Sequence, residues 1–315
     1  MRAFPLHRMQ FGLFTRERSH WAIRFRASRS TTIRVRESVM GVGSARASAS
    51  CRLQTKERPA YFGEVDEMTI ADFNRYGEDI ERIVRPKTSP LAVKMLRSVE
   101  DIPPGAVRPK RDRNHHLAQC QAFALSRRQN ETVAMLKEDN WCFAPLIAYG
   151  LVDKPGDPDI KKFTTFPAFE RGKYVGIVSS PLRTANFEPD VVIIYSDTAQ
   201  LRNMLLPVHY KTAGDQMDSH FFPPSCAYLL VPPMETGRYM VALPDFGECD
   251  RALAADNEII LAVPRARIAE FFSGLLEREQ GKLGPAPSGY MMVPDFPQPP
   301  FYRRLFARWG LDAKE

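Results

Sequence analysis

The sequence predicts one α/β or α+β domain that begins near Met68 and contains a mixed sheet, several helices and two similar halves. Two observations lead to this fold class. Apolar runs of strand length alternate along the chain with segments whose apolar residues recur at helical spacing. Two stretches of the chain also repeat the same order of such parts, as an internal duplication would. A chain of 315 residues with 44% hydrophobic content is long enough to bury a substantial core.

The first half of the predicted domain opens with a helix. Apolar residues recur at helical spacing between Ile70 and Ile83, and Pro86 cannot continue the helix. A second helix, at 115–129, is predicted to end at Asn130, a residue type that is common at helix C-termini. We further predict strands at 89–96 and 131–137, a loop at 101–113, and a short helix that stops at Gly150.

The second half follows a segment, 153–170, that predicts no regular element. Asp197 directly precedes a predicted helix and is expected to be its N-cap. The two prolines Pro223 and Pro224 suit the first turn of a helix that carries Cys226. We also predict strands at 173–182, 190–197, 238–244 and 257–264, helices at 198–207 and 266–280, and a short turn or helix at 245–253.

Both ends of the chain are expected to lie outside this domain, which spans about 68–280. Residues 1–50 hold ten arginines and two glutamates, about +8 of charge, so the rest of the chain is near neutral although the total is +7. We interpret 1–67 as a disordered Arg-rich extension, either a transit peptide or, as we favour, a translated upstream region with the start at Met40 or Met68. Residues 281–315 read as a Pro-rich linker and a C-terminal amphipathic helix that docks on the body or on a partner.

A near-neutral body lacks the clustered basic residues that nucleic-acid binding needs, so we expect no nucleic-acid partner. No apolar run approaches the roughly 20 residues of a spanning helix, so we expect no membrane partner and a cytoplasmic protein. Disulfides are rare in that compartment. The four body cysteines are therefore expected to be core residues, metal ligands or reactive thiols.

The cysteines recur within the repeat. Cys120 and Cys142 are 22 residues apart in the first half, and Cys226 and Cys249 are 23 apart in the second. If the halves are related by a pseudo-twofold axis, the two pairs could converge on it and hold zinc or an iron–sulfur cluster, because thiolates favour these metals. None of the four lies in a C-x-x-C pair, and ordinary buried cysteine is the favoured alternative.

Cys249 is also a candidate nucleophile, because DFGECDR surrounds it with charges. Arg251 would stabilise a thiolate, whereas Asp245 and Glu248 would oppose it, so the sequence leaves the direction of the pKa shift open. A cleft between the halves could instead hold a small molecule, lined by Lys94, Gln121, Arg251 and Glu258. In an enzyme, the candidate catalytic residues would be Lys94, Cys249, Arg251 and Glu258.

Several established motifs are absent. The chain contains neither G-x-G-x-x-G after a strand nor a Walker loop, and neither H-E-x-x-H nor G-x-S-x-G. Dinucleotide binding, P-loop hydrolysis, zincin proteolysis and serine hydrolysis therefore have no support from motifs.

Several short motifs in a fixed order carry a resemblance to a family. They are SPLAVKML, the Cys120-Gln121 pair that opens a helix, AQLRNML after a strand, and Gly247-x-Cys249-x-Arg251 followed by NEIILAVP. Over about 68–280 the chain resembles the domain-of-unknown-function family 169 of archaea and bacteria. The resemblance implies no activity. It marks these positions: Pro90, Val93, Lys94, Cys120, Gln121, Cys142, Gly150, Gln200, Cys226, Gly247, Cys249, Arg251, Glu258 and Pro264.

Three functional hypotheses follow. The leading one is a cytoplasmic metal or iron–sulfur protein, with a redox role and a redox partner open, that uses Cys120, Cys142, Cys226 and Cys249 as ligands. The alternative is a small-molecule enzyme or binding protein without metal, in which Gln121 would contact the bound molecule. The third is an assembly protein that forms oligomers through the aromatic face of its C-terminal helix, made by Phe301, Leu305, Phe306 and Trp309.

Overall fold

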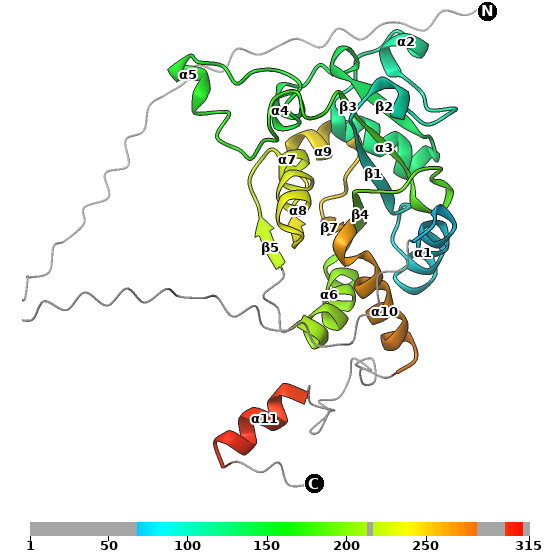
Figure 1. The fold of residues 1–315 in the computed structure, drawn as a ribbon, viewed down its shortest axis with the longest axis vertical. Helices are drawn as coiled ribbons and strands as arrows, with labels where there is room; N and C mark the ends of the chain where they lie inside the picture. The colour runs from blue at the N-terminus through cyan, green and yellow to red at the C-terminus, as the bar shows by residue number, and fades with distance from the viewer. Residues whose placement is uncertain (1–67, 213–216, 282–299, 311–315) are drawn as a thin grey trace, which may run out of the picture. The chain divides into compact units, whose positions relative to one another are not determined.

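A computed structural model describes residues 68–212, 217–281 and 300–310 (Figure 1). These residues all belong to the unit Ala60–Glu315. The predictions for 1–67 and for the linker at 282–299 lie outside the described residues.

A seven-stranded mixed sheet forms the centre of the domain, as predicted. Its strands lie in the order β2-β3-β1-β4-β7-β6-β5, and β5 pairs with β6 in parallel while all other neighbours are antiparallel. The strands are β1 (Leu91–Leu96), β2 (Val133–Leu136), β3 (Gly176–Pro181), β4 (Val191–Ser196), β5 (Met217–His220), β6 (Tyr239–Ala242) and β7 (Ile259–Pro264).

Helices cover both faces of this sheet (Figure 1). One face packs against α1 (Ile70–Ile83), α6 (Thr198–Thr212) and α10 (Ile268–Glu279). The other packs against α3 (Gln119–Gln129), α4 (Phe143–Ala148), α7 (Ser225–Tyr228) and α8 (Val231–Thr236). The remaining helices are α2 (Pro109–Arg113), α5 (Pro158–Lys161), α9 (Phe246–Ala252) and α11 (Pro300–Arg308), and 3₁₀ turns occupy Val99–Asp101, Lys137–Asp139, Leu182–Thr184 and Arg265–Arg267.

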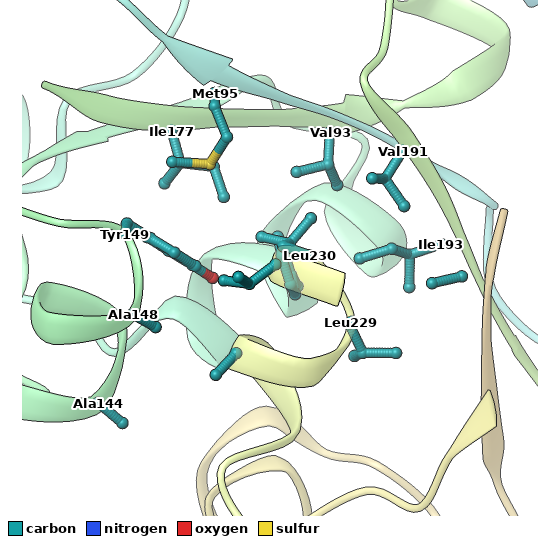
Figure 2. Close-up of a cluster of buried hydrophobic side chains, with 14 of the residues drawn as sticks. Val93, Met95, Ala144, Ala148, Tyr149, Ile177, Val191, Ile193, Leu229 and Leu230 are labelled. Carbon is teal, nitrogen blue, oxygen red and sulfur yellow. The ribbon is translucent and has the colours of Figure 1, made fainter. Parts of the chain in front are cut away.

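The central strands are apolar on both faces because both faces are covered. In β4, Val191, Ile193 and Tyr195 join the core on the α3–α4 side, whereas Val192 and Ile194 join the core on the α1–α6 side. Figure 2 shows the first of these cores, where Tyr149 points toward Leu230.

The order of the strands is compatible with two similar halves. In the first half, β1 is central, β2 lies outermost and β3 lies between them; in the second half, β4, β6 and β7 take the same places in the same chain order. The antiparallel pair of β1 and β4 joins the halves. Helix α3 packs on α9, and α4 packs on α7, so each half contributes to both contacts. Strand β5 has no counterpart in the first half.

Most predicted elements are confirmed, including the C-cap at Asn130, which has a left-handed backbone, and the N-cap at Asp197, which accepts a hydrogen bond from the Gln200 amide. Two predictions were wrong. The loop expected at 101–113 contains α2, which begins at Pro109, where a proline's missing N–H costs nothing. The helix expected to stop near Pro207 continues to Thr212.

Close packing against α10 accompanies this continuation of α6. A Cβ atom on Gly274 of α10 would lie 2.6 Å from the Cβ of Pro207, so only a glycine leaves room for the proline ring. Packing of α6 against α10 therefore offsets the free-energy cost of the backbone hydrogen bond that proline removes from the helix interior.

Candidate functional site

One pocket, of about 390 Å³, gathers the starts of four helices. The residues at or next to the N-caps of α3, α4, α7 and α9 line it, together with residues from the segment 162–166. Helices α3 and α4 come from the first half and α7 and α9 from the second. The pocket therefore lies where the two halves of the sheet order meet.

Three of the four cysteines that the sequence singles out line this pocket: Cys120, Cys142 and Cys226. Cys120 and Cys226 are buried near the starts of α3 and α7, and half-buried Cys142 is the N-cap of α4. The Cys120 thiol donates to the carbonyl oxygen of Gly247 at 3.5 Å. Cysteines that are distant in the sequence are thus brought together by the fold.

Burial keeps these thiols protonated at neutral pH. Burial, followed by the charges of Glu248 and Asp245, raises the pKa of Cys120 to about 12. Burial also raises the pKa of Cys142, and it raises the pKa of Cys226 well above its usual value.

Cys249 does not line the pocket, and Asp245 holds the position equivalent to Cys142. Asp245 is the N-cap of α9, as Cys142 is of α4. The connection from β6 to α9 is shorter than the one from β2 to α4, so equal spacing in the sequence does not give equal places in the fold. Burial, and then Asp256 and Glu248, raise the pKa of Cys249, which is the opposite of what an activated nucleophile needs.

The thiols do not form a preformed metal site. Across 68–212, 217–281 and 300–310, no group of three or more His, Cys, Asp or Glu side chains is arranged to hold a metal ion. Three thiols share the pocket walls, but coordination of zinc or an iron–sulfur cluster would need these side chains to move together.

Asp245 connects two helix starts at the pocket wall. Its Oδ1 accepts the amides of Gly247 at 2.8 Å and Glu248 at 3.1 Å, which caps α9. Its Oδ2 accepts the amide of Ser225 at 2.9 Å and the Ser225 hydroxyl at 3.1 Å, at the start of α7. Four donors therefore satisfy this carboxylate, and its role is to position α7 and α9.

Arg251 supplies a cation at the pocket. Its guanidinium lies over the ring of Trp141, 4.9 Å from the ring centroid, and its side chain is exposed. A Cβ atom on Gly247 would lie 3.1 Å from Asp245 Oδ1, 3.4 Å from Arg251 Nη1 and 3.8 Å from Cys120 Sγ, so Gly247 packs against all three side chains.

Gln119 carries a buried acceptor without a partner beside the same pocket. The residue lines the pocket and is 2% exposed, and its Oε1 has no hydrogen-bond partner among the described residues. Buried polar atoms are nearly always hydrogen-bonded in native proteins, so this oxygen is one of a few exceptions among the described residues.

Behind the pocket lies a buried carboxyl, Glu248, which in the sequence stands out only as a neighbour of Cys249. Tyr195 donates to its Oε2 at 2.9 Å. The hydroxyl of Ser225, which lines the pocket, lies 3.4 Å from its Oε1 and shares one proton between Glu248 and Asp245. Burial raises the pKa of Glu248 to about 7, although the Tyr195 hydrogen bond acts in the other direction. A carboxyl with a near-neutral pKa next to a pocket is typical of acid–base sites.

The network continues away from the pocket. The guanidinium of Arg127 lies over the Tyr195 ring, 4.0 Å from its centroid, and pairs with Glu258 at 3.3 Å, with both side chains almost fully buried. Arg127 also donates to the carbonyl of Ala252 at the end of α9. These contacts fix α3 against α9, whose starts form two walls of the pocket.

Comparison with known proteins identifies the family. A model of the family DUF169, described as uncharacterised ArCR, matches residues 79–274. The match covers more than half of the 315 residues. The chain belongs to the DUF169 family. No curated protein and no solved structure matches it.

The four residues that were expected to line a cleft do not lie together: one lines the pocket, and the others belong to the surrounding helices and sheet. Gln121 caps its own helix, because its Oε1 accepts the Ala118 amide at 2.9 Å, and it does not line the pocket. Glu258 is the buried partner of Arg127. By the alternation of β1, Lys94 shares the sheet face of Ala92 and Leu96, opposite to the pocket. Of the four residues expected to line a cleft, the pocket therefore contains only Arg251.

Two further features of this DUF169 chain concern a second hollow and the described helices. A hollow of about 480 Å³ runs along α6, but its walls are mainly apolar and it contains none of the predicted site residues. Among the described helices, none is both long and apolar enough to cross a membrane.

Proposed function

We propose that this chain is a small-molecule binding protein or enzyme, and that its ligand occupies the pocket walled by Cys120, Cys142 and Cys226. The observation that carries the proposal is the convergence of four helix starts from both halves on one pocket. Its volume, about 390 Å³, falls within the range of small-ligand sites.

In a reaction, Glu248 would serve as the acid–base group. Its pKa of about 7 suits proton transfer at neutral pH. Because Ser225 both lines the pocket and donates to Glu248, its hydroxyl is the route by which a proton would pass between the carboxyl and a ligand. The thiols, with raised pKa values, would act as protonated walls and not as nucleophiles.

The test uses the fluorescent aromatic sulfonate 1-anilinonaphthalene-8-sulfonate and the full chain. We expect one saturable site per chain. Two substitutions that place bulk in the pocket, Cys142→Phe and Thr165→Trp, should each abolish this binding. The matched control is Leu205→Trp, which fills the hollow along α6 and should leave binding unchanged. Binding that survives both pocket substitutions, or is lost only with Leu205→Trp, would refute the proposal.

The three thiols also favour a second candidate, a zinc or iron–sulfur site that forms when metal draws the side chains together. The four thiols are free, which is compatible with a reducing compartment, and a cytoplasmic location is part of this proposal. Metal content and visible absorption would be measured after anaerobic reconstitution. If the pocket thiols are the ligands, Cys120→Ser and Cys226→Ser should lose the metal, whereas Cys249→Ser should keep it. A colourless, metal-free protein would end this hypothesis.

A further inference from the structure

The thiols give the pocket a wall of uncharged groups. Cys120, Cys142 and Cys226 line the pocket, and burial, with a further contribution from the charge of Asp245, raises the pKa of all three. A protonated cysteine behaves as a small apolar side chain. Ala144 extends this apolar surface.

Aromatic rings form another part of the lining, and several of them are exposed. Phe143, Phe163 and Phe246 line the pocket and are 54%, 64% and 81% exposed. Phe166 lines the pocket as a buried residue, and its ring centroid lies 6.5 Å from that of Phe143. Large apolar side chains that stay exposed around a pocket are typical of a site that a ligand covers, and ring faces pack well against a flat molecule.

The charges at the pocket oppose each other. A Cβ atom on Gly247 would lie 3.1 Å from Asp245 Oδ1 and 3.4 Å from Arg251 Nη1, so a carboxylate and a guanidinium flank the same glycine. An anion near Arg251 would be repelled by Asp245, and a cation near Asp245 would be repelled by Arg251. Neither sign of charge is therefore favoured in a ligand.

Each charged lining residue also has contacts within the protein. Asp245 accepts hydrogen bonds from three backbone amides, and the guanidinium of Arg251 lies over the ring of Trp141. Lys162 pairs with Asp159 at 3.8 Å, and the side chains of both are exposed to solvent. A charged ligand would give up hydration in this pocket without meeting an unopposed charge of the other sign.

We propose that the ligand is an uncharged molecule with a flat, fused-ring body. The rings pack among the exposed phenylalanines and against the thiol wall, and no ion pair forms between ligand and protein. This inference rests on the proposed function, since it names the class of molecule that fills the same pocket.

The experiment measures binding of three naphthalenes to the full chain at neutral pH, by titration calorimetry and ligand-observed NMR. The probes are 2-naphthylmethanol, 2-naphthoate and 2-naphthylmethylammonium, which share one ring system and differ in charge. We expect the alcohol to bind at least about five-fold more tightly than either ion, because each ion loses hydration and meets a like charge. The alcohol should also displace the naphthalene sulfonate, and Cys142→Phe should abolish its binding.

One substitution tests the balance of charges. Arg251→Gln leaves Asp245 unopposed at the pocket, so the ratio of ammonium affinity to carboxylate affinity should rise by at least about five-fold. Affinity for the alcohol should stay within about two-fold, and because Arg251 is exposed the fold should persist. Arg111→Gln changes an exposed arginine outside the pocket and is the matched control.

A second pair of substitutions tests the aromatic lining. Phe163→Ala and Phe246→Ala should each weaken binding of the alcohol by about three-fold or more, because each removes apolar surface that the ligand covers. Phe221→Ala is the matched control, since Phe221 is 55% exposed and does not line the pocket.

Tighter binding of either ion than of the alcohol, or an unchanged ratio of ion affinities in Arg251→Gln, would overturn the inference. So would alcohol binding that survives Cys142→Phe, or equal effects of the three phenylalanine substitutions. If the alcohol fails to bind while the naphthalene sulfonate binds at the pocket, the ligand class is wrong and the proposed function stands. If neither binds there, both are wrong.

Discussion

Glu248 shows how burial changes the chemistry of one residue. It is fully buried, and its pKa is raised from 4.5 to about 7, with burial as the largest cause. Between these two pH values the folded protein keeps a proton on Glu248 that the unfolded chain has released. Folding is therefore favoured by Glu248 at low pH, and this contribution is lost as pH rises through about 7.

Replacing Glu248 with glutamine should remove this pH dependence. Glutamine cannot ionise, and its carbonyl can still accept from Tyr195. Relative to the wild type, Glu248→Gln should become more stable as pH rises from 5 to 8, by up to about 3 kcal/mol. Urea unfolding at both pH values measures the change. Glu100→Gln, at an exposed glutamate, is the control; a stability difference for Glu248→Gln that is the same at pH 5 and pH 8 would contradict the account.

At the residue scale, the sequence was informative about the cysteines and less so about their neighbours. It singled out four cysteines because cysteine is rare; Cys120, Cys142 and Cys226 share one pocket, whereas Cys249 does not line it. Gln119 and Glu248 carry no such signal, since a glutamine or glutamate looks exposed until the fold buries it. Lys94 interrupts an apolar strand, but only the pairing of β1 shows which face it occupies.

Among the elements, α3 depends on a buried ion pair. Arg127 pairs with Glu258, covers the Tyr195 ring and donates to Ala252. Truncation of one partner leaves the other charge buried without compensation, which is strongly destabilising.

Arg127→Ala should therefore lower the free energy of unfolding by about 3–5 kcal/mol. Arg113→Ala removes an exposed arginine that pairs with Glu131, and as the matched control it should cost no more than about 1 kcal/mol. Guanidinium unfolding of both variants gives the comparison. Equal losses in the two variants would show that the buried pair does not fix α3.

Sequence reasoning located the elements with strong periodicity and missed those that depend on context. Strands β4 and β7 are continuous apolar runs, and α1 has a clear apolar face. Strand β5 reads MDSH, with no apolar pattern, and it forms only because β6 offers it a parallel edge. Helix α7 has four residues, too short for any helical period to be visible.

For the whole molecule, the strand order explains why distant cysteines meet. Strands β1 and β4 pair at the centre, and the helix starts of each half reach the same pocket. The repeat in the sequence predicted that all four cysteines would converge; the pocket contains three of them and not Cys249, because the connection before α9 is shorter than the one before α4.

The C-terminal segment is predicted to be dispensable for folding. Helix α11 forms as expected, with Phe306 contacting the rings of Tyr302 and Trp309, but neither main core cluster contains a residue from it. Deletion of 290–315 should change the free energy of unfolding by less than about 0.5 kcal/mol. Light scattering of the full chain and of the deletion variant tests the assembly hypothesis. That hypothesis predicts that the full chain forms an oligomer and that the deletion abolishes it. A large loss of stability would place α11 in the folding unit.

The central claim is that a small molecule occupies the thiol-walled pocket. Alkylation by N-ethylmaleimide, followed residue by residue by mass spectrometry with and without the naphthalene sulfonate, tests it most directly. Cys142 lines the pocket and is half-buried, whereas Cys249 is half-buried outside it. We predict that the sulfonate slows alkylation of Cys142 and leaves that of Cys249 unchanged. Equal protection of both thiols, or protection of neither, would contradict the account.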